Sequence, residues 1–161
     1  YATELVSLIR KNFSHFGIGV GGYPEKHPES PSKKDDLLHL KEKVDAGADF
    51  ITTQLFFDNQ VYFKFLEDCG KANIEIPVLP GLLPVQSIGQ VQRFCKMCEA
   101  SLPTELQNKL EDVEKDNQPA VGADWAKEQV KELVKEGAPG FHLYALNQSE
   151  ASLQILEWLK K

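Results

Sequence analysis

The sequence has few of the features that mark export, membranes or nucleic-acid binding. Its three cysteines, Cys69, Cys95 and Cys98, are odd in number and too few for a disulfide framework, so we expect reduced cytosolic thiols. The longest apolar run, 50–57, is interrupted by Thr and Gln and is far too short to span a bilayer. A basic face is also lacking, because the net charge is −6 and the lysines are interleaved with acidic residues. Neither a membrane nor a nucleic acid is an expected partner.

The amino terminus, Tyr1–Glu4, lacks the basic and apolar regions of a secretory signal, and it also lacks a starting Met. We therefore expect a cytoplasmic chain that belongs to a longer protein. The sequence does contain the material of a packed core, since 42% of its 161 residues are hydrophobic and 26% are charged. This composition is ordinary for one soluble globular domain.

Hydrophobic periodicity alternates between strand and helix patterns along the chain. Alternation of this kind predicts parallel strands joined by right-handed crossovers. An open doubly wound sheet and a (β/α)8 barrel both fit, but a complete barrel needs about 250 residues, so four strands would be half of one. The expected strands are 16–22, 50–57, 76–83 and 140–146, and the expected helices are 2–13, 35–46, 58–73, 87–98, 102–116, 124–136 and 149–160.

Two short motifs match known sites only as strings. Gly17-x-Gly19-x-x-Gly22 has the spacing of the dinucleotide fingerprint, but these glycines fall inside a predicted strand and a Pro-rich loop follows instead of a helix. Cys95-x-x-Cys98 falls inside a predicted helix and has no second pair of ligands, so two helical thiols are favoured over a redox or zinc site. No metal site is expected.

Polar and aromatic residues gather where the predicted strands end. In parallel α/β folds, ligands bind at the carboxyl ends of the strands and in the loops that follow. The segments at these ends are 23–30, 54–58, 80–84 and 141–147. A Gln within the apolar and aromatic strand 50–57 is notable, because a buried amide is costly without hydrogen-bond partners. Gln54 is therefore the leading candidate for ligand recognition, and a Gln bonded to neighbouring polar groups in a barrel interior is the alternative.

The same segments resemble the methylenetetrahydrofolate reductase family, in that family's order and over nearly the whole chain. The spacing is similar to that of the eukaryotic members. The resemblance implies a (β/α)8 TIM barrel of which residues 1–161 supply strands five to eight. It also implies FAD as cofactor, NADPH or NADH as co-substrate, and reduction of 5,10-methylenetetrahydrofolate to 5-methyltetrahydrofolate in one-carbon and methionine metabolism. The strings that carry it are Gly22–Glu29, Lys41–Asp49, Thr53–Asp58, Pro80–Pro84 and Phe141–Asn147.

The resemblance implies a set of flavin-contacting positions on the loop and helix that follow the first strand. They are Tyr23, His27, Ser30, Asp36, His39 and Lys43. The last three are offset by three and seven residues, which places them on one helix face. A solvated charged face has the same spacing and is the alternative. Glu42 and His39 depart from the bacterial pattern, so contacts near the flavin pyrophosphate are expected to differ.

The positions that the resemblance assigns to the substrate are Gln54, Gln90, Phe94 and Tyr144. For Phe94 the alternative is core packing, and His142 is interpreted as a structural histidine. Gln148 stands where the family usually has Arg, so recognition of the folate glutamate tail is not carried over.

No segment matches the family's catalytic Glu, which belongs to its first barrel strand. We therefore expect no catalytic proton donor in this chain, an inactive fragment in isolation, and a homo-oligomer for the full-length protein. Another pterin-binding barrel enzyme and a non-catalytic half-barrel module remain as alternatives. A Schiff-base aldolase is disfavoured, since no predicted strand contains Lys.

Overall fold

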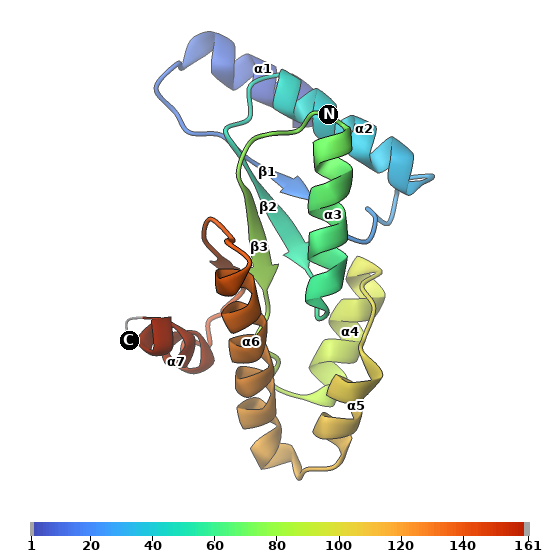
Figure 1. Cartoon of the computed structure of the whole chain (residues 1–161), viewed down its shortest axis with the longest axis vertical. Coiled ribbons are helices and arrows are strands. Elements are labelled where there is room, and N and C mark those ends of the chain that lie inside the picture. The colour runs from blue at the N-terminus through green and yellow to red at the C-terminus, as the bar shows by residue number, and fades with distance from the viewer. Residues whose placement is uncertain (1, 160–161) are drawn as a thin grey trace.

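The structure is a computed structural model that describes residues 2–159, and it has an α/β fold built on one parallel sheet (Figure 1). The four strands lie in chain order, β1-β2-β3-β4, and all neighbours pair in parallel. The strands are β1 (Gly19–Gly22), β2 (Phe50–Leu55), β3 (Val78–Leu82) and β4 (His142–Leu143). The helices are α1 (Ala2–Asn12), α2 (Lys33–Asp45), α3 (Asn59–Lys71), α4 (Ile88–Cys98), α5 (Thr104–Glu111), α6 (Gln118–Lys135) and α7 (Glu150–Leu159), with a 3-10 turn at Lys115–Asn117.

Side-chain caps explain where three of these helices begin. Ser32, Asp58 and Ser87 have extended backbones, and their side chains accept hydrogen bonds from the backbone N–H groups of Asp35, Gln60 and Gln90 respectively. Such caps satisfy donors that have no partner within the helix. Asp58, where the predicted helix 58–73 starts, is the N-cap of α3, and α2 begins two residues before its predicted start because Ser32 caps it.

The hydrophobic core has two parts. The first joins β1, β2 and β3 to α1, α2, α3, α6 and α7, around fully buried side chains such as Ile51, Phe56 and Leu82. The second joins the residues after β2 and β3 to α4 and α5, around Val91, Leu106 and Leu110. Figure 1 shows α4 and α5 beyond the end toward which β2 and β3 point. The second core therefore supports the carboxyl edge of the sheet.

The strands β1 and β4 are shorter than predicted. The predicted strand 16–22 is paired only over 19–22, because Ile18 N–H donates to the Asp49 carboxylate (2.7 Å) and Phe16 is 49% exposed. The predicted strand 140–146 is paired only over 142–143, and the chain turns away through Leu146 and Asn147, which both have positive φ. His142 is exposed, and its ring lies 4.5 Å from that of Tyr144, so its structural role stays a prediction.

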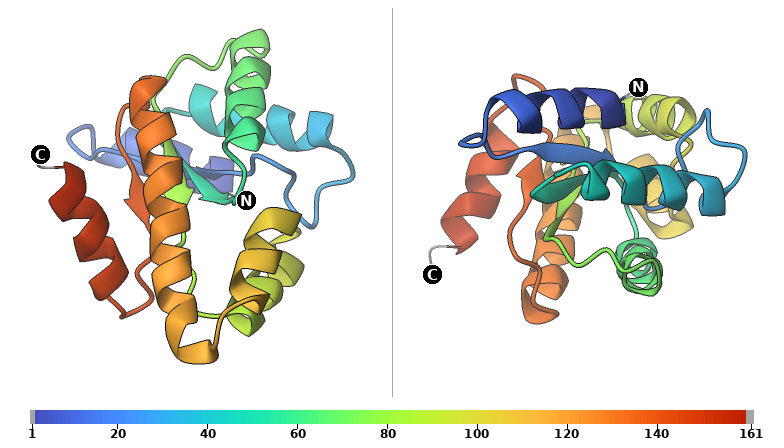
Figure 2. Two further views of the ribbon diagram at one scale, coloured as in Figure 1. Left: turned by 60° about the horizontal axis from the view of Figure 1, so that its bottom comes forward. Right: turned by 90° about the horizontal axis from the view of Figure 1, so that it is seen from above.

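The predicted helix 124–136 begins six residues earlier, at Gln118. Pro119 occupies the first turn, where a missing N–H costs nothing, and the Gln118 side chain bonds Ile88 N and Leu110 O. Two views in Figure 2 show α6 beside α7, and the two helices are in contact.

The glycines of the dinucleotide-like string lie in or just before β1, and the next helix begins only at Lys33. A Cβ on Gly19 would lie 2.5 Å from the Phe50 ring, so a glycine there allows close packing of that ring. The cysteines are free and buried, with Cys95 and Cys98 in α4 as predicted.

Candidate functional site at the carboxyl edge of the sheet

A small pocket lies where the loop after β1 meets the end of β2. It has a volume of about 10 Å³, and its walls come from three segments that are far apart in the sequence. The lining residues are Tyr23, Pro24, Glu25, Lys26, Gln54, Leu55, Cys98 and Ala100. Two predicted ligand contacts, Tyr23 and Gln54, are thus brought together at one edge of the sheet.

The loop after β1 is organised around the ammonium of Lys26. Its Nζ donates hydrogen bonds to the carbonyls of His27 (2.9 Å), Pro28 (3.3 Å) and Ser30 (2.9 Å) and lies 3.4 Å from Glu99 Oε2. One cation therefore fixes the loop that carries His27 and Ser30.

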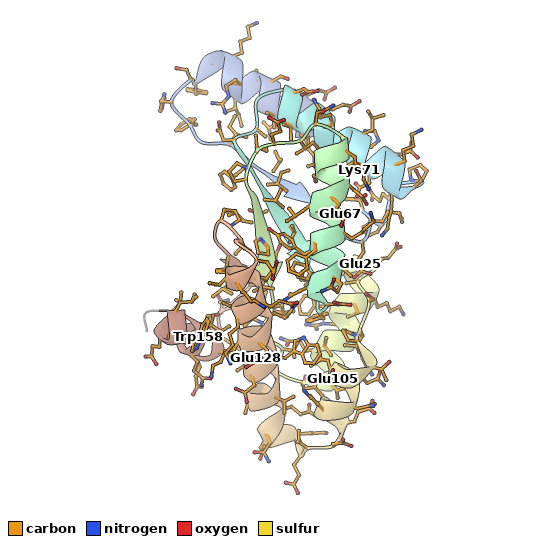
Figure 3. The ribbon with its side chains drawn as sticks, in the orientation of Figure 1. Glu25, Glu67, Lys71, Glu105, Glu128 and Trp158 are labelled. Carbon is orange, nitrogen blue, oxygen red and sulfur yellow. The ribbon has the colours of Figure 1, made fainter. Side chains whose placement is uncertain are left out.

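A second anchor ties this loop to the region after α4. The Glu25 carboxylate accepts hydrogen bonds from Ser101 N and Ser101 Oγ, both at 2.8 Å. Figure 3 shows Glu25 beside the carboxyl end of α4. These two hydrogen bonds hold the segment after α4 against the loop at one side of the pocket.

The predicted flavin contacts on the loop lie close to α2. The rings of Tyr23 and His27 are 4.4 Å apart and meet edge to face. His27 N–H donates to Asp36 Oδ2 (3.0 Å), while Ser30 Oγ donates to Ser32 O (3.2 Å). Burial, followed by the nearby Asp36 carboxylate, raises the pKa of Tyr23 above its ordinary value, so its hydroxyl stays protonated.

The three predicted contacts on α2 differ in their surroundings. Asp36 faces the loop, as its bond to His27 shows, and Lys43 Nζ donates to Gly21 O of β1 (2.6 Å). Burial lowers the pKa of Lys43, and the Asp36 carboxylate opposes that shift. The side chain of His39 is 63% exposed and lies 3.3 Å from Glu42. Asp36 and Lys43 therefore face the loop and β1, whereas His39 does not.

Gln54 is half-buried near the end of β2. Its Oε1 accepts a hydrogen bond from the N–H of Leu55 (2.9 Å), and its Nε2 has no partner among residues 2–159. An amide with one end held and the other end unpaired at a pocket wall is suited to ligand recognition.

Tyr144 follows β4 and reaches across β3. Its hydroxyl donates to Thr53 O (3.0 Å), and its backbone N–H donates to Leu82 O (2.8 Å). Burial, followed by Cys98 and Tyr23, raises the pKa of Tyr144. Tyr144 thus belongs to the same edge as Tyr23 and Gln54.

Of the four predicted substrate contacts only Gln54 lines the pocket; Tyr144, Gln90 and Phe94 do not. Gln90 Oε1 accepts from the N–H of Gln86 (2.7 Å), the residue before the N-cap of α4, so its amide oxygen is held by the preceding loop. Phe94 packs against the second core, and the Arg93 guanidinium lies 5.3 Å from its ring centroid. Phe94 is thus partly buried against the core, and its contact with a substrate stays a prediction.

The sequence analysis missed three residues of this edge, namely Thr53, Gly81 and Lys26. Thr53 is fully buried and its Oγ1 accepts from Gly81 N (2.8 Å), while Lys26 organises the loop. A Thr next to the leading Gln and a Gly in the following strand were the only signals, and neither is specific. Lys26 resembled any surface lysine.

Larger hollows exist elsewhere, but their chemistry differs. One of them, of about 530 Å³, lies between α5 and α6 around Trp125. Its carboxylates include Glu105 and Glu128, both labelled in Figure 3, and they would repel an anionic ligand. No described helix is long and apolar enough to cross a bilayer. Among residues 2–159, no group of three or more His, Cys, Asp or Glu is arranged to hold a metal ion.

The fold and the site define a parallel α/β protein whose polar side chains converge at the carboxyl edge of the sheet. The sequence model described as methylenetetrahydrofolate reductase matches residues 1–160, and the chain therefore belongs to the methylenetetrahydrofolate reductase family.

Known proteins of that family align with nearly the whole chain. The 5,10-methylenetetrahydrofolate reductase of Salmonella typhimurium is 41% identical in an alignment of 161 positions that covers 99% of this chain and 54% of that protein. Methylenetetrahydrofolate reductase (NADH) 1 of Arabidopsis thaliana is 39% identical, over 96% of this chain and 28% of that protein. The chain spans about half the length of its bacterial relatives. Since the two identities are so close, the eukaryotic character stays a prediction.

A solved structure shares the fold. It is an uncharacterized protein from Clostridium thermocellum, described as binding two copies of 5-methyl-5,6,7,8-tetrahydrofolic acid. The TM-score is 0.65 at 20% identity, and the match covers 98% of this chain and 58% of the other.

Proposed function

We propose that residues 1–161 form the second half of a reductase barrel, namely strands five to eight of a (β/α)8 barrel in one partial domain. The parallel strands in chain order and the half length relative to bacterial relatives support this arrangement. Parallel sheets are normally covered on both faces. Alternate residues of β2 and β3 are only half-buried here: Phe50, Thr52, Gln54 and Leu79. The remaining strands of the same protein are the proposed cover.

The proposed activity of the complete protein is reduction of 5,10-methylenetetrahydrofolate with NADPH or NADH and with FAD as cofactor, in the cytoplasm. Family membership supports it, and the folate bound by the Clostridium neighbour makes a folate the first ligand to test. Bound FAD would supply hydride transfer. We assign to this chain the binding and orientation of the cofactor and the substrate. We assign no proton donor to the residues of its described pocket.

The residues near β1 fit part of a flavin site by their chemistry. Lys43 supplies a cation at the end of β1, suited to a phosphate oxygen. Asp36 Oδ2 is used by His27 N–H, and Oδ1 remains to accept from a sugar hydroxyl. Tyr23, His27 and Ser30 add two rings and a hydroxyl on a loop that Lys26 holds. His39, which is exposed, is the weakest member of the proposed set.

The observation that carries the proposal is the amide of Gln54: its Oε1 accepts one hydrogen bond, and its Nε2 has no partner among the described residues. A pterin ring and a nicotinamide carboxamide both present an amide-like edge with a donor beside an acceptor. Gln54 can complement this edge through Nε2 and the second lone pair of Oε1. Either ligand would therefore be recognised by the same side chain, with Tyr144 and Phe94 as proposed aromatic neighbours and Gln90 at the start of α4.

The test uses the full-length protein with Gln54→Leu. We expect kcat/KM for methylenetetrahydrofolate to fall about 30-fold, equivalent to roughly 2 kcal/mol, since a polar ligand edge loses its partner. Gln92→Leu is the matched control, because Gln92 is exposed on α4 and lies outside the pocket. A wild-type protein that does not reduce methylenetetrahydrofolate, or an unchanged Gln54→Leu enzyme, would contradict the proposal.

The isolated chain offers a second test. It contains only one half of the proposed flavin site, so we expect it to bind FAD weakly or not at all. The measurement is the visible absorbance of the purified 161-residue chain after incubation with FAD and gel filtration. Stoichiometric flavin would show that this half suffices.

A further inference from the structure

The pairing of β2 with β3 is interrupted at the pocket. The register pairs Ile51 with Val78 and Thr52 with Leu79, and the next pair is Leu55 with Gly81. Two residues of β2 therefore stand opposite one residue of β3, which is the geometry of a β-bulge. The two residues of β2 are Thr53 and Gln54. Bulges next to binding sites commonly redirect a side chain.

Three groups hold this bulge in place. Thr53 is fully buried and its Oγ1 accepts from the N–H of Gly81 (2.8 Å), so a side chain replaces a ladder bond. The carbonyl of Thr53 accepts from the hydroxyl of Tyr144 (3.0 Å), which comes from beyond β4. A Cβ on Gly81 would lie 2.2 Å from Thr53 O, so only glycine admits this approach.

The bulge determines the position of Gln54, the residue that follows Thr53. The Oγ1 and the backbone carbonyl oxygen of Thr53 both accept hydrogen bonds, from Gly81 of β3 and from Tyr144 after β4, and Gln54 follows directly. The Gln54 amide then bonds the N–H of Leu55 (2.9 Å), which keeps its Nε2 unpaired at the pocket wall. A regular ladder would not leave the same backbone N–H for the Gln54 side chain.

We propose that Thr53 is a positioning residue: its hydroxyl, bonded to Gly81, and its carbonyl, bonded to Tyr144, fix the bulge that presents the Gln54 amide to the ligand. The inference rests on the proposed function for the identity of the ligands. It assigns Tyr144 a second role, which is to hold β2 through its hydroxyl. Because one amide is proposed to meet two ligands in turn, displacing it weakens both.

The first comparison is between Thr53→Val and Thr53→Ser in the full-length protein. Valine keeps the shape but loses the acceptor, whereas serine keeps the hydroxyl. We expect Thr53→Val to raise the KM for methylenetetrahydrofolate and the KM for NAD(P)H together, each about 5- to 10-fold, with kcat within about 3-fold of wild type. Thr53→Ser should restore both KM values to within about 2-fold.

A matched pair of tyrosines separates positioning from stability. Tyr62 OH donates to Val78 O (2.9 Å) at the opposite end of β3, the same kind of bond that Tyr144 makes to Thr53 O. Tyr144→Phe and Tyr62→Phe should lower the melting temperature similarly. Only Tyr144→Phe should raise the two KM values and shift the side-chain amide resonance of Gln54 in a ¹H–¹⁵N spectrum.

The outcomes distinguish the two proposals. If the wild type does not reduce methylenetetrahydrofolate, the proposed function fails, and the Gln54 amide resonance in Thr53→Val and Tyr144→Phe still tests the positioning role. If the wild type is active but Thr53→Val and Tyr144→Phe keep both KM values and the amide resonance, the positioning role is wrong. If Thr53→Val does not fold, Tyr144→Phe against Tyr62→Phe decides.

Discussion

The amino and carboxyl ends of the strands each have a tyrosine hydroxyl that donates to a strand carbonyl, but the surroundings of these two bonds differ. At the amino edge, the Tyr62 hydroxyl bonds Val78 O beside a mostly apolar cavity of about 170 Å³. At the carboxyl edge, the Tyr144 hydroxyl bonds Thr53 O beside a pocket of about 10 Å³. The larger hollow has few polar groups to orient a ligand, whereas the smaller one has Gln54, Glu25 and Lys26. In half of a proposed barrel, convergent polar groups identify a site better than volume does.

The edges also differ in how fully their polar groups are paired. At the amino edge, the Asp49 carboxylate accepts from Ile18 N–H (2.7 Å) and from Arg10 (2.6 Å), which joins α1 to the start of β1 and β2. At the carboxyl edge, Gln54 Nε2 has no partner among the described residues. The amino edge thus has a fully paired carboxylate, whereas the carboxyl edge has an unpaired amide nitrogen that is available to the proposed ligand.

The largest expected effect comes from adding one methyl group at the carboxyl edge. Gly81→Ala would place a Cβ 2.2 Å from Thr53 O and 2.8 Å from the Tyr144 ring. We expect the free energy of unfolding to fall by about 3 kcal/mol, measured by urea denaturation. Gly70→Ala is the control, since its added Cβ meets nothing within 4 Å and alanine favours the helix α3 by up to ~1 kcal/mol. An unchanged Gly81→Ala protein would show that the bulge tolerates a side chain.

A smaller effect should separate the thiols of the two edges. Cys69 is 2% exposed beside the amino-edge cavity, and burial raises its pKa to about 12. Cys69→Ser places a hydroxyl there with no evident partner, so we expect a loss of about 2 kcal/mol in urea denaturation. Cys98→Ser, at the more polar carboxyl edge, should cost less than half as much. Equal losses at the two positions would remove this part of the contrast.

The smallest expected effect depends on pH and comes from the exposed ion pair of the amino edge. The Ile18 N–H, then Arg10, lower the pKa of Asp49 below its ordinary value of 3.8 in the folded state. A depressed folded pKa means that the stabilisation is present above about pH 3.8 and is lost as the pH falls through the folded value. Asp49→Asn should therefore lower the melting temperature at pH 7 and should differ less from wild type below pH 3.8.

Asp124→Asn is the control for this experiment, because Asp124 is exposed on α6 and has no ion pair or hydrogen bond within the described part of the chain. Its melting temperature should match wild type at every pH. If the Asp49→Asn difference is the same at pH 3 as at pH 7, then the charge of Asp49 is not its cause.

The sequence predicted the strands, their parallel pairing and most helix starts, because these depend on local signals. Asp58 and Ser87, for example, precede helices as capping residues do. The short β4 and the early start of α6 were missed, since they depend on contacts distant in sequence. Gln118, for example, bonds Ile88 and Leu110.

The site was predicted in part for the same reason. Gln54 and Tyr23 could be placed at one edge because parallel strands end together. The bulge could not be predicted, because it requires Thr53, Gly81 and Tyr144 from three segments to meet. The bond that Gln90 accepts from Gln86 N could not be predicted either, and the contact of Gln90 with a substrate stays a prediction. The type of a residue does not reveal with which neighbouring group its polar side chain forms a hydrogen bond in the folded protein.

The ammonium of Lys26 gives the loop after β1 the internal order that other proteins obtain from a bound cation, since three carbonyls converge on one charge. A loop ordered in this way loses its conformational entropy when the chain folds rather than when a ligand arrives. If the proposed anionic cofactor binds here, its association should be accompanied by little rearrangement of His27 and Ser30, because the loop is already ordered.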